Sequence, residues 1–276
     1  MTAQVDVIVP FRNQGAWLRQ ACASLQRQTM PCWRALLIND QSTPDVVGLA
    51  QQLSQAEPRF RLLHLTEPKP APGPWLARNL GLHSATAPLV SFLDADDLWH
   101  PLKLEHQLAL HQGEAGQDVL SVCAYHRFDA ISLKVEETRT PPPALLRHQL
   151  WRGNPIPLSS VIMARPRLLQ SGGFRPEHHE DYGLWLRLFH SAHPPRYRCL
   201  PKALMAYRLH HQSVSAARYR SILAVNELFR QHMPQRHHRW PALVHWSLER
   251  SRVALTKRKS SELPEAFLSL IEDGYE

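Results

Sequence analysis

The sequence predicts an α/β protein with a mostly parallel β-sheet covered by helices on both faces. Two observations carry this prediction. Through residues 5–112, short apolar or β-branched segments alternate with segments of helical periodicity. The chain also has 276 residues, 43% of them hydrophobic, which is enough for one large domain with its own core. Because parallel strands need helical crossovers, such alternation is typical of a sheet with helices on both sides.

Each element follows from its local pattern. The β-branched run 5–9, VDVIV, predicts a buried strand, and apolar residues at helical spacing predict a helix over 16–26. By the same criteria we expect strands at 35–38, 60–65 and 88–93, and helices at 45–56, 75–84 and 102–112, the last with Pro101 at its start.

The alternation loosens after residue 115. Here the expected elements are strands at 118–128 and 159–164, a proline-led helix or linker at 141–153, an amphipathic helix at 181–192 and two more helices within 221–256. We therefore expect one domain over residues 1–216, in two halves that meet at 115/116, and a C-terminal helical appendage over 217–276.

Polar side chains follow three of the predicted strands. These are Asn13 after the first strand, Asp40 after the second, and the cluster Asp94, Asp96 and Asp97 after 88–93. In an open α/β sheet, ligands bind beyond the carboxyl ends of the strands. Three carboxylates in four positions repel one another, so a cation, basic neighbours or solvent must offset the repulsion. Mg²⁺ or Mn²⁺ shared with substrate phosphates would do so.

Several classes of protein are disfavoured. There is no GxGxxG after the first strand, no P-loop and no HExxH. The four cysteines are dispersed, no signal-peptide pattern opens the chain, and no apolar run approaches the roughly 18 residues of a membrane span. These features favour a cytoplasmic location.

An ordered series of stretches resembles the family 2 inverting glycosyltransferases of the GT-A fold. VDVIVPFRN, LLINDQST, WLARNLGL and FLDADDLW are similar to the opening strand, the nucleoside-binding turn, the "ARN" helix and the DXD metal motif. GGFRPEHHEDYGLWLRL and YRLHHQSVSA are similar to the catalytic-base segment and the closing loop, so the resemblance covers residues 5–216. It implies a metal-dependent transfer of sugar from a nucleoside-diphosphate sugar, with UDP the common choice, to a hydroxyl of a glycan or lipid-linked glycan.

The resemblance also implies roles for individual residues. Asp181, with Glu180 beside it, would be the base that takes the acceptor proton. Residues 1–115 would bind the donor and 116–216 the acceptor. The implied donor-binding residues are Pro10, Phe11, Asn13, Asp40, Arg78, Asp94 and Arg208. The implied metal ligands for Mn²⁺ or Mg²⁺ are Asp96 first, then Asp97 and His210.

Structural interpretations of these residues remain open. Asp97 could cap a turn, Glu180 and Asp181 could cap their helix, and Arg78 could be an ordinary surface residue. The proline-rich segment 67–75 departs from the glycine- and serine-rich run usual in the family, which leaves the sugar preference open.

Two rival functions fit parts of the sequence. The net charge of +8 and a basic stretch over 230–259 suggest a nucleic-acid binder, but no aromatic–basic binding module is present, so we expect no nucleic-acid partner. A silent GT-A scaffold is disfavoured because Asp40, Asp96 and Asp181 are all retained.

The basic stretch has a further interpretation. Its apolar face and the lysines and arginines after it would suit a peripheral contact with the inner face of a membrane. The alternative that we favour is packing of the apolar face, with Trp240 and Trp246, on the catalytic domain.

Overall fold

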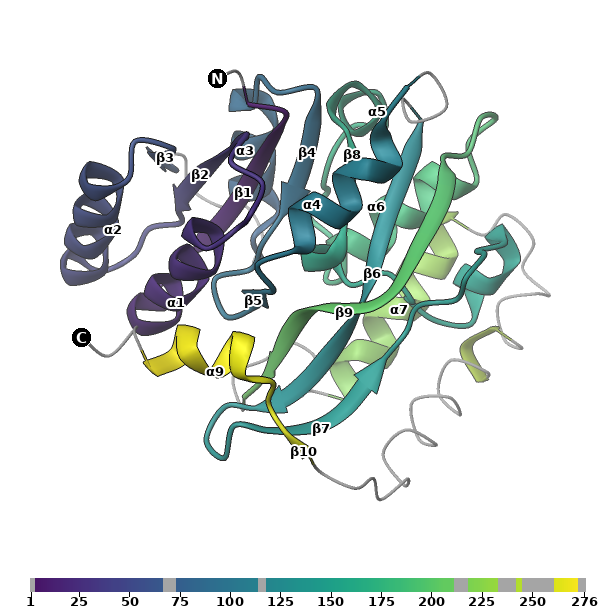
Figure 1. The fold of residues 1–276 in the computed structure, drawn as a ribbon. Helices are drawn as coiled ribbons and strands as arrows, with labels where there is room; N and C mark the ends of the chain where they lie inside the picture. Colours follow the sequence, from purple (N-terminus) through teal and green to yellow (C-terminus); the bar gives the residue numbers. More distant parts are fainter. Residues whose placement is uncertain are drawn as a thin grey trace.

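A computed structural model describes residues 3–66, 73–113, 118–210, 218–232, 242–244 and 261–272. A twisted sheet forms the centre of the molecule, and helices lie on both of its faces (Figure 1). Its strand order is β10-β7-β6-β8-β4-β1-β2-β3, with β9 paired to β5 and β6 off this path. Within the described ranges, each helix falls short of the length and apolar character that crossing a bilayer requires.

The first half of the chain forms the parallel part of the sheet. Its elements are β1 (Val5–Phe11), α1 (Gly15–Gln26), β2 (Trp33–Asn39), α2 (Pro44–Ala56), β3 (Phe60–His64), α3 (Trp75–Ser84) and β4 (Leu89–Phe92). Strand β1 pairs in parallel with β2 and β4, and β2 pairs in parallel with β3. The predicted α/β fold class is confirmed.

Alternation along β1 explains the two-sided core. Val7 and Val9 pack into one buried cluster with Leu18 of α1. Ile8 points to the other face and packs into a second cluster with Leu82 of α3. Strand side chains alternate between faces, so a strand that is apolar on both faces must be covered twice.

The second half extends the sheet with antiparallel strands and one parallel pair. It contains β5 (Leu98–Trp99), α4 (Lys103–Leu108), η1 (Ala109–His111), β6 (Val119–Asp129), β7 (Lys134–Arg139), η3 (Arg147–Trp151), η4 (Leu158–Ser160), β8 (Ile162–Ala164), α5 (Arg165–Gln170), α6 (Glu180–Phe189) and β9 (Arg196–Leu209). Strand β6 runs antiparallel to β7 and β8 and parallel to β9. The predicted helix or linker at 141–153 contains only the short 3₁₀ turn η3.

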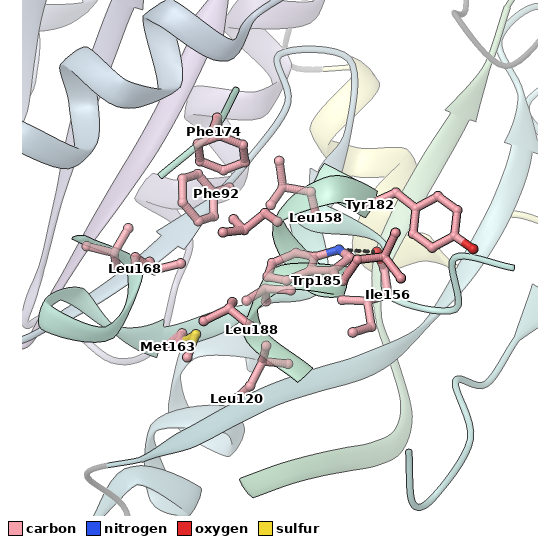
Figure 2. Close-up of a cluster of buried hydrophobic side chains, with 14 of the residues drawn as sticks. Phe92, Leu120, Ile156, Leu158, Met163, Leu168, Phe174, Tyr182, Trp185 and Leu188 are labelled. Atoms are coloured by element: carbon pink, nitrogen blue, oxygen red, sulfur yellow. Dashed lines mark hydrogen bonds between the residues drawn. The ribbon is translucent and has the colours of Figure 1, made fainter. Parts of the chain in front are cut away.

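Helix α6 contributes large side chains to the buried core that packs against this part of the sheet. Tyr182 and Trp185 are almost completely buried, and Figure 2 shows them beside Ile156 and Leu158, with Phe174 and Phe92 further along the cluster. The amphipathic pattern that predicted this helix therefore corresponds to real burial. Its first residues, Glu180 and Asp181, are fixed in space by that packing.

The C-terminal elements return to the sheet. These elements are α7 (Arg218–His232), β10 (Ser261–Glu262) and α9 (Glu265–Glu272). Helix α7 packs against α6, and β10 pairs antiparallel with β7. In α9, Phe267 and Leu270 are fully buried in a cluster with Leu98 and Phe128. The end of the chain thus shares a core with the preceding residues, and the domain division at residue 216 stays a prediction.

Candidate active site

The carboxyl ends of β1, β2 and β4 lie at one edge of the sheet because these strands are parallel neighbours. Two hydrogen bonds connect the loops that follow β1 and β2 at this edge. Asn13 Oδ1 accepts a hydrogen bond from the Thr43 N–H at 2.8 Å, and the Asn13 N–H donates to Ser42 Oγ at 3.2 Å. Asn13 adopts a left-handed φ of 57°, which asparagine tolerates. Asp40 follows β2 directly, so the structure brings Asn13, Asp40 and the Asp94–Asp97 turn to the same edge.

Arg78 connects this edge to α6. Its side chain donates to Asp94 Oδ1 at 2.5 Å and to Glu180 Oε1, which is 102 residues away in sequence. Arg78 is only 6% exposed. Burial by itself lowers the pKa of Arg78, but the two carboxylates outweigh it and raise that pKa above its ordinary value. Arg78 is therefore a buried side chain that pairs with two carboxylates, and its interpretation as a surface residue is wrong.

The two carboxylates at the start of α6 have different surroundings. Glu180 is buried and paired with Arg78, and burial, partly offset by Arg78, raises its pKa to about 7. Asp181 is less buried and accepts a hydrogen bond at Oδ2 from Asn154 Nδ2 at 2.8 Å. Burial also raises the pKa of Asp181, against the opposing effect of Arg78. Glu180 is thus occupied by an arginine, whereas Asp181 contacts a neutral amide.

Asp96 meets the residue predicted for the closing loop. His210 Nε2 lies 2.8 Å from Asp96 Oδ2, and the His210 ring packs 4.5 Å from that of Trp17. The pairing of β5 with β9 produces this contact, because it brings the end of β9 beside the turn after β4. Both side chains keep some exposure, 23% for Asp96 and 11% for His210.

Asp96 and His210 together provide two side chains of the kinds that bind metal ions. Carboxylate oxygen and imidazole nitrogen both occur as ligands of divalent transition metals, and carboxylates suit Mn²⁺ and Mg²⁺. In the part of the chain that the structure describes, no three His, Cys, Asp or Glu side chains gather into a set that could hold an ion. A cation here would share Asp96 and His210 with phosphate oxygens of a substrate, which is the usual arrangement for these ions.

Six of the predicted donor-binding and metal-binding residues are buried: Pro10, Phe11, Asp40, Arg78, Asp97 and Arg208. Asp97 and Arg208 are each 2% exposed, and Phe11 belongs to the core. Asp97 Oδ1 accepts from the Arg208 N–H at 3.3 Å, while Arg208 Nε donates to the Asp96 carbonyl at 2.9 Å. Burial, with the charges of Asp96 and Asp94, raises the pKa of Asp97. Asp97 and Arg208 thus hold the turn by hydrogen bonds. The assignment of the buried residues to donor or metal stays a prediction that burial does not favour.

Residues outside the matched motifs also build the site. Ser159 Oγ accepts from the Asp94 N–H at 3.1 Å, and Gln20 Oε1 accepts from Arg208 at 2.7 Å. Trp17 and Asn154 contact His210 and Asp181, as described above. The only sequence signal among them is the turn-forming GNP stretch around Asn154.

We expect Arg78→Met to lower the free energy of unfolding by about 3 kcal/mol, because it leaves Glu180 buried and Asp94 partly buried without their cation. Urea denaturation measures this loss. The matched control is Arg59→Met, which removes a more exposed pair with Glu57 and should cost less than about 1 kcal/mol. Equal losses in the two variants would show that the bridge contributes no more than a surface pair.

The fold and this site together define a GT-A-like α/β protein. Two solved structures share the fold: a mannosyltransferase from Pyrobaculum calidifontis in complex with GDP-Man and Mn²⁺, and S. aureus TarS 1–349 in complex with UDP-GlcNAc. The TM-scores are 0.64 and 0.63 and the identities 15% and 17%. The matches cover 100% and 89% of this chain, and 80% and 71% of the other chains.

The chain belongs to the Glycosyl transferase family 2, whose model matches residues 6–170. It is 26% identical over 219 residues to the UDP-Glc:alpha-D-GlcNAc-diphosphoundecaprenol beta-1,3-glucosyltransferase WfgD of Escherichia coli, a match that covers 79% of this chain and 82% of that protein. It is 35% identical over 127 residues to an uncharacterized glycosyltransferase of Rickettsia bellii, a match that covers 46% of this chain but only 17% of that protein. The chain thus spans a small part of some relatives and most of others.

Proposed function

We propose that this protein transfers a sugar from a nucleoside-diphosphate sugar, with UDP as the expected nucleotide, to a hydroxyl of a glycan or lipid-linked glycan, with inversion at the anomeric carbon. One observation carries the proposal. Arg78 joins Asp94, in the turn after β4, to Glu180 at the start of α6, and so keeps Asp181, the next residue, close to that turn. An inverting transfer needs one base near the donor site, and this arrangement supports Asp181 in that role.

The reaction follows from the position of Asp181. Its ionised carboxylate takes the proton of the acceptor hydroxyl as that oxygen forms a bond to the anomeric carbon. On the opposite face, the bond from the anomeric carbon to the diphosphate oxygen breaks, and the nucleoside diphosphate leaves with the electron pair. Glu180 is held by Arg78, so Asp181 is the better placed base of the two.

The donor residues would act at the same edge. Asp40 and Asn13 would contact the nucleoside next to Pro10, and Asp94 would lie near the ribose. The structural neighbours bound to UDP-GlcNAc and GDP-Man support a nucleotide-sugar donor, and the name of WfgD supports a lipid-linked acceptor.

Asp96 and His210 would hold Mn²⁺ or Mg²⁺. When bound, such an ion would neutralise the negative charge that develops on the departing diphosphate. The complex of the Pyrobaculum calidifontis mannosyltransferase with GDP-Man and Mn²⁺ supports this choice.

The cytoplasmic location and a peripheral membrane contact belong to the same proposal. Most of the basic stretch on which the membrane contact rests, including Trp240 and Trp246, lies outside the described residues. Within it, Leu243 packs against the core, as the alternative of packing on the domain expects, whereas Val244 is exposed.

A panel of nucleotide sugars tests the proposal by donor hydrolysis with Mn²⁺, with Mg²⁺ and with EDTA. We expect hydrolysis of a UDP-sugar that requires the metal. If calorimetry detects no binding of any nucleoside diphosphate, the protein is a scaffold rather than a transferase. Salt-sensitive binding to random oligonucleotides in place of nucleotide sugars would instead favour the nucleic-acid function.

A further inference from the structure

The amide of Asn154 has a defined orientation toward Asp181. Asn154 Oδ1 accepts a hydrogen bond from the Ile156 N–H at 3.1 Å, and Asn154 Nδ2 donates to Asp181 Oδ2 at 2.8 Å. Because the backbone N–H can pair only with the amide oxygen, the amide nitrogen must face the carboxylate. Asn154 lies between η3 and η4, outside every stretch that the family resemblance uses.

The core holds the segment that carries Asn154 in place. The Tyr182 hydroxyl donates to the Leu150 carbonyl, and Trp185 Nε1 donates to the Ile156 carbonyl at 3.3 Å, the contact drawn as a dashed line in Figure 2. Both aromatic side chains are almost completely buried. Asn154 itself is exposed, so its place is set by its buried neighbours rather than by its own packing.

Asp181 is surrounded by charges of both signs. Arg78 faces it from α3, Asp94 from the turn after β4, and Glu180 precedes it on α6. Burial disfavours the ionised form of Asp181, and an N–H donor on the carboxylate favours that form. The bond from Asn154 also restricts rotation of the carboxylate, while the remaining lone pairs can accept the proton of an acceptor hydroxyl.

We propose that Asn154 is a positioning residue for the general base, which orients the Asp181 carboxylate toward the acceptor and stabilises its ionised form. The inference rests on the proposed function, since it requires Asp181 to be the base.

The test is the pH dependence of kcat in Asn154→Ala. The base must be ionised, so activity is lost as the pH falls through its pKa. Removal of the hydrogen-bond donor raises the pKa of Asp181. The acidic limb of the pH–rate profile should therefore move to higher pH by roughly one unit. We expect kcat at neutral pH to fall roughly tenfold or more, while the Kd for UDP stays unchanged.

Two further variants separate positioning from a merely structural role. Tyr182→Phe removes a hydrogen bond between the same segment and the same helix but leaves the carboxylate untouched, so its acidic limb should stay in place. Asn154→Asp keeps the shape of the side chain but sets a second carboxylate against Asp181, and should move the limb further upward than Asn154→Ala does.

Each result decides the inference. The proposed role of Asn154 would be overturned if the acidic limb of the pH–rate profile did not shift in Asn154→Ala, or if it shifted equally in Tyr182→Phe. If Asp181→Asn is inactive while Asn154→Ala behaves like the native protein, only the role of Asn154 fails. If Asp181→Asn keeps native turnover, the proposed function of the site fails with it.

Discussion

Asp181→Asn is expected to lower turnover by roughly 10²–10⁴, the usual contribution of a general base. Asparagine keeps the size of the side chain and can still contact Asn154, but it cannot take a proton. The donor residues lie on other elements, so nucleotide binding should stay near normal. Steady-state kinetics gives the turnover, and calorimetry with UDP and Mn²⁺ gives the affinity.

Glu180→Gln is the matched control, since it removes a carboxylate from the adjacent position of the same helix. Glu180 pairs with Arg78, so this variant should lose stability more than turnover. If Asp181→Asn lost nucleotide affinity along with activity, Asp181 would have a structural role. Equal losses of turnover in the two variants would show that the assignment of Asp181 as the base is wrong.

Asp96→Asn is expected to abolish transfer and metal-dependent UDP binding together. Asp96 is the partly exposed carboxylate of the cluster that pairs with His210, and the neutral amide is a much weaker ligand for a hard cation. Calorimetry of UDP binding with Mn²⁺ and with EDTA measures the effect. If the native protein binds UDP equally well in both, the metal assignment is wrong.

Asp97→Asn provides the comparison one position along the chain. Asp97 is buried and accepts a hydrogen bond from the Arg208 N–H, which an amide oxygen can also accept, so an amide should replace it at little cost to metal dependence. A loss equal to that in Asp96→Asn would make Asp97 a second ligand.

The carboxylate cluster is stabilised at each position by a different partner. Asp94 is paired with Arg78 at 2.5 Å, and Asp96 contacts His210 at 2.8 Å. At Asp97, burial favours the protonated form, and the backbone N–H of Arg208 supplies a hydrogen bond. Arg78 and these hydrogen bonds therefore offset part of the repulsion in the protein alone, and a cation shared with a diphosphate would offset more.

The sequence by itself determined the parallel half of the sheet and the edge that carries the site. β-Branched runs and helical periodicity are local properties, so β1 to β4 and helices α1 to α3 could be predicted from short windows. Parallel strands end at the same edge, and this rule alone brought Asp40 and the Asp94–Asp97 turn together.

Strands β6 and β8 were also predicted, but β7 and β9 were not predictable in the same way. In β7 only Val135 is apolar, and in β9 Pro201 and Lys202 lie at a shift of register against β6, so neither sequence shows a clean alternation of apolar and polar residues. The helix α9 gains its place from a core formed with Leu98 and Phe128, far away in sequence.

Only the tertiary structure decided how the site is assembled. It paired Arg78 with Glu180 across 102 residues, set Asn154 on Asp181, and placed Asp97 and Arg208 in the interior although their motifs suggested ligand contacts. A motif specifies which side chains follow a strand, but burial and partners depend on which distant elements pack over them. That packing is a property of the whole core, and no local window of the sequence contains it.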